Sequence, residues 1–180
     1  GSPGDRGIHV IVTARNDTAI HGYSLAFTYP ADVLELTSIS TMGPHVESVE
    51  PDFVAPTLDN QLGLGNLGVI LAYQEPLVLK ELPPLTVDDY PRIIARLTFD
   101  VLSNALGGSY PLRLVDGIGQ PANYNRFSDR GTSLTPRLED GVFRVFGGNV
   151  LQLEKKLLIG GIHQSTEIKA LVRHPEPLAG

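Results

Sequence analysis

One loop of this 180-residue sequence combines side chains that can recognise a ligand. Residues 117–131 are mostly small and polar, but a short run near their middle also contains aromatic, amide and guanidinium groups. Aromatic rings stack on sugars or apolar side chains, and the polar groups supply directional hydrogen bonds. We predict a small recognition patch here; the alternative is that the aromatic residues pin the loop onto the protein. The residues concerned are Asn123, Tyr124, Asn125, Arg126 and Phe127.

Adjacent carboxylates form a second candidate site. Asp88 and Asp89 lie in a proline-rich stretch and can supply oxygen ligands to calcium, which takes about six to eight of them. Neighbouring carboxylates point apart on an extended chain, and the sequence has no Asp-x-Asp-x-Asp-Gly loop. A solvated loop is therefore the alternative to a calcium site, and we expect no other cofactor.

The remaining motifs argue against catalysis. Zero cysteines exclude thiolate nucleophiles and cysteine-ligated metals. Residues 63–68 match Gly-x-Gly-x-x-Gly, but a dinucleotide site needs these glycines between a strand and a helix, and here they precede a predicted strand. There is no Gly-x-Ser-x-Gly motif. The histidines show no metal-ligand spacing; they are His9, His21, His45, His163 and His174. We expect a protein that is not an enzyme.

Composition narrows the class of partner. Fourteen basic and 20 acidic residues give a net charge of −6, the opposite of what a phosphate-binding surface needs. No stretch approaches the roughly 20 apolar residues of a membrane span. We therefore expect neither nucleic acid nor membrane insertion. Apolar residues make up 42% and charged residues 19% of the chain, which predicts a folded domain.

The elements that must position these residues are strands. Alternation of apolar and polar residues places Tyr23, Phe27 and Tyr29 in the core and predicts an antiparallel β-sandwich of about nine strands. We predict long loops at 41–62 and 75–91 and one short helix at 150–158. The predicted strands are 8–14, 23–29, 33–39, 69–73, 93–101, 110–115 and a closing hairpin at 134–146.

Several of these segments resemble a known family. Residues 20–36, with Gly22-Tyr23-Ser24-Leu25 and the later Val33-Leu34-Glu35-Leu36, are similar to the opening of cohesin-like domains. Residues 93–101 and the closing Glu139-Asp140-Gly141-Val142 fit the same pattern. The resemblance covers about residues 8–146 and implies a nine-stranded jelly roll related to cellulose-binding modules. It also implies binding of dockerin modules through one sheet face, usually with calcium held by the dockerin.

The domain boundaries follow from the same pattern. Residues 1–4 look like a linker left by cloning, and 5–147 form the predicted sandwich. Residues 148–180 contain a weak echo of the N-terminal strand, because Gly161-Ile162-His163 repeats Gly7-Ile8-His9. This C-terminal extension is either the last strand or strands of the same domain or the start of a further repeat.

We therefore expect a binding or structural module of a larger secreted or cell-surface bacterial protein. The expected partner is another protein module, dockerin-like or a further copy, bound through a sheet face. A carbohydrate-binding module with a polysaccharide partner is the alternative. A structural repeat that assembles head to tail by strand addition is the third hypothesis.

Overall fold

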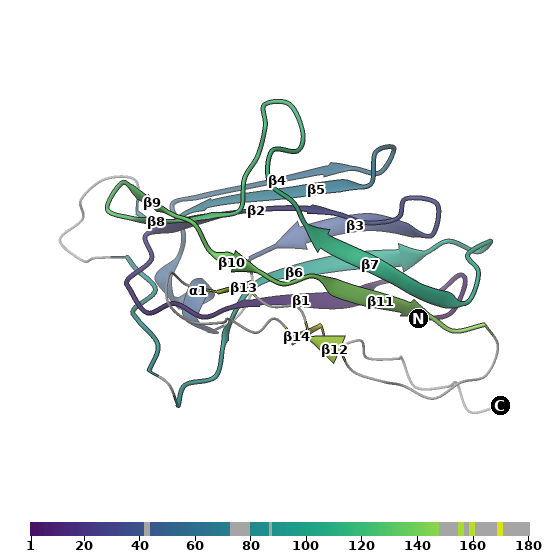
Figure 1. Cartoon of the computed structure of the whole chain (residues 1–180), viewed down its shortest axis with the longest axis horizontal. Coiled ribbons are helices and arrows are strands. Elements are labelled where there is room, and N and C mark those ends of the chain that lie inside the picture. Colours follow the sequence, from purple (N-terminus) through teal and green to yellow (C-terminus); the bar gives the residue numbers. More distant parts are fainter. Residues whose placement is uncertain are drawn as a thin grey trace.

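The computed structural model describes residues 1–41, 44–72, 80–86 and 88–147, together with the backbone of three short strands near the C-terminus. Within these residues, eleven strands and one short helix, α1 (Pro44–Val49), lie between Ile8 and Val145. Ten of these strands form two antiparallel sheets that face each other (Figure 1), and β10 pairs outside them. The predicted antiparallel β-sandwich is therefore confirmed, with two more strands than the predicted nine.

The smaller sheet has the order β1-β6-β3. Its strands are β1 (Ile8–Ala14), β6 (Arg92–Val101) and β3 (Leu34–Ser40). Alternate side chains of each strand are buried, because successive side chains of a strand point to opposite faces of its sheet. The apolar side chains of this sheet form one wall of the core.

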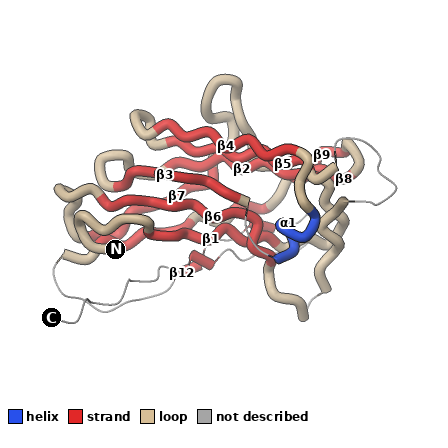
Figure 2. Tube along the Cα trace, turned by 180° about the vertical axis from the view of Figure 1, so that it is seen from behind, coloured by secondary structure: helices blue, strands red, loops and turns tan. Residues whose placement is uncertain are grey.

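The larger sheet has the order β11-β7-β2-β5-β4, and β8 pairs with β2 beyond the end of β7. Figure 2 shows it from the other side. Its strands are β11 (Gly141–Val145), β7 (Gly108–Leu114), β2 (Gly22–Thr28), β5 (Leu64–Ile70), β4 (Phe53–Asp59), β8 (Arg126–Asp129) and β9 (Thr132–Leu134), which pairs with β8. The central strand β2 therefore has two partners along one edge.

Aromatic side chains fill the space between the sheets. Tyr23, Phe27 and Tyr29 are buried, as the alternation predicted. Phe99 packs edge-on against Tyr29, with 5.3 Å between the ring centroids, and against Phe143 at 6.1 Å. Such edge-to-face pairs add stability beyond the apolar area that they bury. The two sheets are thus joined by contacts between residues far apart in the sequence.

Three predicted elements were wrong. The predicted loop at 41–62 contains α1 and β4, because a polar composition with several prolines is typical of a loop and hides both elements. The strand predicted at 69–73 begins at Leu64, so two of the motif glycines lie inside a strand. The predicted helix at 150–158 includes β12 (Lys155–Lys156). The other residues predicted for that helix lie outside the described part of the chain.

The predicted closing hairpin was also wrong in its pairing. Its second strand is β11, which pairs with β7. Its first half is divided between β9 and β10 (Arg137–Leu138), and β10 pairs with β13 (Ile159–Gly160). A further pair joins β12 to β14 (Lys169–Ala170). Beyond residue 147 only these backbone segments are described.

The N-terminal residues pack on the sandwich. The Gly1 amine donates to the Arg144 carbonyl at 3.0 Å, and the Phe146 N–H donates to the Gly1 carbonyl at 2.8 Å. Gly4 donates to the carbonyl of Val101. Gly1 is buried and bonds at the open edge of β11, whereas Gly4 bonds to the end of β6 in the smaller sheet. Among the described residues, no helix has the length and hydropathy needed to cross a membrane.

Strand β4 is the free edge of the larger sheet and contains Pro56. The missing backbone N–H of Pro56 removes no hydrogen bond between β4 and β5. Tyr29 N–H bonds to Gly63 and Leu71 N–H bonds to His21, so odd-numbered residues of β5 bond to β2. Even-numbered residues of β5 therefore bond to β4, and Pro56 faces the open edge. A proline there removes a donor that another strand could use.

We predict that Pro56→Thr promotes self-association. The free energy of unfolding should change by less than about 1 kcal/mol, because no ladder hydrogen bond involves the Pro56 nitrogen. The restored N–H completes the edge, and size-exclusion chromatography with light scattering should show dimers or larger species. Thr57→Val is the control, since the Thr57 backbone already bonds to β5. A variant that stays monomeric at the same concentrations would contradict the protective role of Pro56.

Candidate functional site

The five residues of the predicted recognition patch differ in exposure: some lie on the surface and others are buried. Tyr124 has 46% of its surface exposed and Arg126 is half-buried. Phe127 lies in the core with its ring edge-on to Tyr23, 6.5 Å between centroids. Asn125 is completely buried. The expectation of a five-residue patch therefore needs correction: alternation along β8 turns Phe127 inward and leaves Tyr124 and Arg126 on the surface.

The Asn125 side chain holds its loop against strand β2. Its amide nitrogen donates to the Ala26 carbonyl at 3.0 Å, and its amide oxygen accepts from the Ala26 N–H at 2.9 Å. The amide thus pairs with β2 as a strand residue would, at the point between the end of β7 and the start of β8. Asn123 holds the preceding turn by donating to Pro121 and Ile118 carbonyls. Neither amide is available to a ligand in these arrangements.

Asp116 fixes the base of the same loop. One carboxylate oxygen accepts from the Asn125 N–H at 2.8 Å, and the other lies 2.7 Å from Nη1 of Arg126. Partial burial alone would raise the pKa of Asp116, but the bonds from Asn125 and Arg126 outweigh it and lower that pKa below its ordinary value. The carboxylate is therefore charged at neutral pH and holds Arg126 in place.

The predicted calcium ligands do not converge. The Asp89 carboxylate accepts from the Thr86 N–H at 2.7 Å and from the Thr86 hydroxyl at 2.9 Å, and these bonds lower the pKa of Asp89. Asp88 and Asp89 are exposed. In the part of the chain that the structure describes, no group of three His, Cys, Asp or Glu side chains can hold a metal ion. The Asp89 carboxylate caps a turn instead.

Among the described histidine side chains, His21 has carboxylates close to both ring nitrogens. Its Nε2 lies 3.3 Å from Glu81 and its Nδ1 lies 3.3 Å from Asp129. The two ring nitrogens point in different directions, so these carboxylates stand on opposite sides of the imidazole and cannot share one metal ion with it. The arrangement joins the segment 80–86 to the end of β8.

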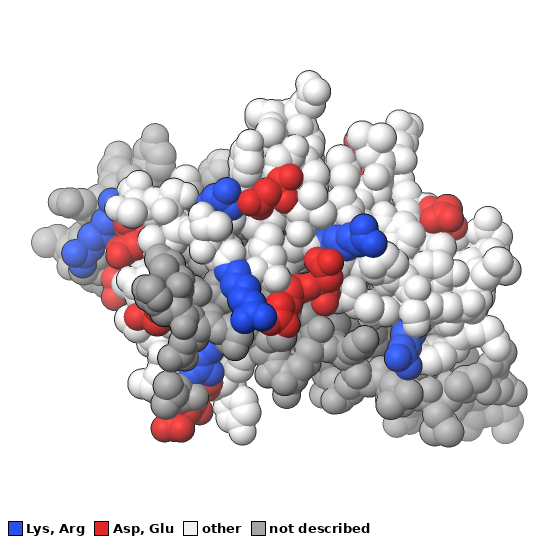
Figure 3. Space-filling view, in the orientation of Figure 1, with Lys and Arg blue, Asp and Glu red and all other residues white. Residues whose placement is uncertain are grey.

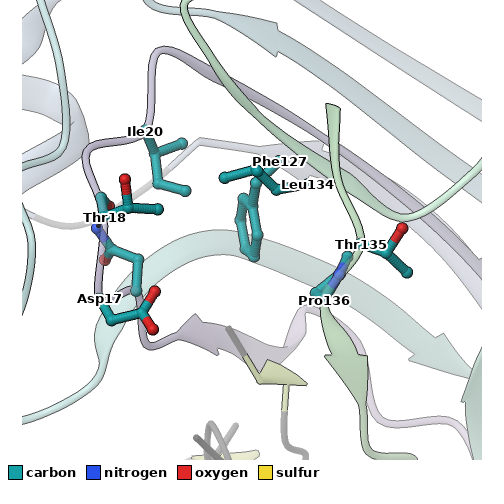
Figure 4. A pocket seen from close by; sticks show the side chains of 8 residues that line it. Asp17, Thr18, Ile20, Phe127, Leu134, Thr135 and Pro136 are labelled. Carbon is teal, nitrogen blue, oxygen red and sulfur yellow. Dashed lines mark hydrogen bonds between the residues drawn. The ribbon is translucent and has the colours of Figure 1, made fainter. Parts of the chain in front are cut away.

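Two cavities lined by described residues are too small for a metabolite. One lies between the β1–β2 connection and the β9–β10 segment, with Phe127 as its floor (Figure 4). Its volume of about 10 Å³ is room for a single water at most. A second, of the same volume, lies between the sheets next to Leu25 and Leu97. Ligand pockets are usually about 300–1,000 Å³, so these cavities are packing defects.

The outer side of the larger sheet offers a surface instead. The partners along β2, β5 and β4 are in register, and their inward side chains include Leu25, Leu67 and Val69. We call the opposite side the outer face. It is formed by Gly22, Ser24, Ala26 and Thr28 on β2, Leu64, Asn66, Gly68 and Ile70 on β5, and Phe53, Ala55, Thr57 and Asp59 on β4.

Small side chains dominate the middle of the outer face. Ser24, Gly68 and Ala55 form one cross-strand row, and β8 adds Arg126 opposite Ser24. A Cβ atom placed on Gly68 would meet nothing within 4 Å. Phe53, exposed by 52%, lies in the next row beside Ile70. The middle of the outer face therefore carries only small side chains, with Phe53 at one border and Arg126 at another.

This face was only half predictable. The alternation in 22–28 shows which residues of β2 point away from the core. The first half of β5 was missed because its glycines are typical of a turn, and β4 was missed because it lies in a predicted loop. The charge pattern is mixed: on the side of the molecule seen in Figure 3, acidic and basic side chains lie next to each other and much of the surface is uncharged. No extended basic surface appears among the described residues on that side.

Replacing Asn125 should cost far more stability than replacing Asn123. Asn125→Ala leaves the buried N–H of Ala26 without a partner and removes one of the two hydrogen bonds to its carbonyl, which we expect to lower the free energy of unfolding by about 2–4 kcal/mol. Asn123→Ala removes turn bonds at the surface and should cost about 1 kcal/mol or less. Urea unfolding of both variants gives the comparison. Equal costs would show that Asn125 is not a ladder residue.

Asp116 should stabilise the fold only above the ordinary pKa range of aspartate. Its folded pKa is lowered, so the stabilisation is present above about pH 4 and is lost as the pH falls through the folded pKa. The stability difference between wild type and Asp116→Asn should therefore shrink on acidification. Solvent screening keeps this difference small. Urea unfolding between pH 2 and 7 measures it, with Asp88→Asn as the control. A difference that stays constant contradicts the assignment.

Neither a protein-family model nor a curated protein matches the sequence. Solved structures match its fold. A chain of a type I cohesin–dockerin complex from Clostridium thermocellum aligns over 81% of this chain and 92% of its own, with TM-score 0.59 and 15% identity. The third cohesin ScaC of Acetivibrio cellulolyticus, solved with the ScaB dockerin, aligns over 82% and 93%, with TM-score 0.59 and 15% identity.

A third match extends the comparison to a cohesin on its own. The seventh ScaB type I cohesin from Pseudobacteroides cellulosolvens aligns over 85% of this chain and 90% of its own, with TM-score 0.52 and 15% identity. At these identities the likeness concerns the fold, and it agrees with the resemblance carried by residues 8–146. By its fold, this chain is a cohesin-like β-sandwich domain.

Proposed function

We propose that this chain is a non-catalytic protein-binding module that docks another protein module on its outer face. The observation that carries the proposal is the flat row of Ser24, Gly68 and Ala55 in a rigid three-strand register. Small side chains let a partner approach the backbone closely, and Phe53 and Ile70 at the border supply apolar area. Several of the solved structures with this fold are complexes with dockerins, which supports a protein partner.

The described part of the chain offers little support for the alternatives. A polysaccharide site needs a row of exposed aromatic rings, but Phe127 is in the core. Catalysis or small-molecule binding needs a pocket, and the described cavities are near 10 Å³. A calcium ion in the complex would, on the cohesin resemblance, belong to the partner.

We infer an extracellular or cell-surface bacterial setting from the same resemblance. We also propose that residues 148–180 belong to this domain. The pairing of β13 with β10 supports this, since β10 lies between β9 and β11 of the sandwich. Head-to-tail assembly through a strand of this extension is the competing proposal.

A steric block on the outer face tests the proposal. A Cβ atom on Gly68 would meet nothing within 4 Å, so Gly68→Arg can project a long side chain from the outer face, and a side chain also suits a strand better than glycine. We expect unchanged stability and a loss of partner affinity of more than about tenfold. Ser38→Arg is the matched control, because Ser38 is an exposed residue of β3 in the other sheet.

The binding measurement uses the whole chain, immobilised, and three probes. These are dockerin modules such as those of the matched complexes, soluble copies of this chain, and cellulose, each with calcium and with chelator. Saturable dockerin binding that Gly68→Arg removes and Ser38→Arg keeps would support the proposal. Binding of cellulose alone, binding of further copies alone, or equal effects of the two variants would contradict it.

A further inference from the structure

Tyr124 and Arg126 are held in place by the residue between them. Asn125 is fully buried and bonded on both sides of its amide to Ala26, so the backbone at this point is fixed relative to β2. The Ser24 hydroxyl donates to the Tyr124 carbonyl at 2.6 Å. The two neighbours of Asn125 therefore project from a rigid base at the border of the outer face.

The two side chains are also ordered against each other. The Arg126 guanidinium carbon lies 5.3 Å from the centre of the Tyr124 ring, within the range of cation–π contacts. Asp116 and the Asn125 carbonyl accept from Nη1 of Arg126, at 2.7 and 2.6 Å. A pair ordered before binding loses little conformational entropy when a partner docks.

The contacts leave binding capacity at both side chains. The hydrogen bonds that the described residues make to the Arg126 guanidinium all use Nη1, although the group carries five N–H donors. Nearly half of the surface of Tyr124 is exposed, and Tyr124 is not one of the core residues. Next to Arg126 the row of Ser24 and Gly68 provides space, since a Cβ atom on Gly68 would meet nothing within 4 Å.

We propose that Tyr124 and Arg126 form a subsite that receives a glutamate or aspartate side chain of the protein that docks on the outer face. Carboxylates match the fork of guanidinium donors, and the aliphatic stem of the acid would lie on the tyrosine ring. This inference rests on the proposed function and names the chemistry of the partner at one border of the face. Arg126 brings a guanidinium group to that border, where Asp116 pairs with it through Nη1, whereas Asp59 lies on β4 at the opposite edge.

The subsite is testable without the natural partner. The probe is the peptide acetyl-Ala-Glu-Ala-amide, and its control is the same peptide with Gln in place of Glu. Binding is followed by NMR on the labelled whole chain, at the Arg126 Nε–H and the Tyr124 ring signals. We expect saturable shifts at both positions with the Glu peptide and about tenfold weaker binding of the Gln peptide, which lacks the charge.

Two variants and one control locate the site. Arg126→Gln should abolish the shifts at the tyrosine ring, and Tyr124→Ala, which leaves the Asp116–Arg126 pair intact, should weaken binding several-fold. Arg113→Gln removes an exposed arginine from β7 and should leave the affinity unchanged. Equal binding of the two peptides, shifts that do not saturate, or an equal loss in Arg113→Gln would overturn the proposal. Tighter binding of glucuronate than of the Glu peptide would overturn it too, in favour of an acidic glycan.

The outcome is separable from that of the proposed function. If a docked module loses affinity with Gly68→Arg but not with Arg126→Gln, the outer face is the docking surface and the subsite is wrong. If the Glu peptide binds as expected but no protein module docks, Tyr124 and Arg126 form a carboxylate site, but the proposed function fails and the assignment of that site to a docked protein fails with it.

Discussion

The backbone groups at strand ends and sheet edges constrain this fold more than any single contact. Each unpaired N–H or carbonyl in a buried place costs about 1–3 kcal/mol, so a two-sheet sandwich must find partners for them. Side-chain amides do this twice here. Asn125 pairs with both backbone groups of Ala26, and Asn60 pairs in the same way with Leu36 at the free edge of β3, at 2.8 and 3.1 Å. Tyr29 in turn donates to the Asn60 amide oxygen at 2.6 Å.

These amides also explain how a flat binding surface coexists with open edges. The outer face needs a regular register, and regular sheets invite other strands. At the edges the chain departs from regularity: Pro56 removes a donor on β4, Asn60 occupies the edge of β3, and Gly1 bonds to Arg144 at the edge of β11. A partner that docks as proposed would therefore contact side chains on the outer face instead of pairing with the backbone at an edge.

The sequence predicts those parts of the fold whose residues have one buried and one exposed side. β1, β2 and β6 show the alternation clearly, and their positions were predicted to within one residue. β4 was missed because both its sides are largely exposed, so no alternation marks it. At the candidate site, Tyr124 and Arg126 were predicted as surface residues. The buried position of Asn125 depends on Ala26, 99 residues away, and no local pattern encodes such a pairing.

The closure of the ladder by Asn125 has a consequence for how such a domain diversifies. Val115 and Asn125 both bond to Ala26, so the chain leaves the sheet and returns to it at one residue of β2. The stretch between them is therefore a closed insertion with fixed ends, and residues 117–123 form its outer part. Its length and composition can change during evolution, or be exchanged by grafting, while the register of β2 with its neighbours stays the same. The loop beside Tyr124 is thus the place where related domains can acquire different specificities on one unchanged scaffold.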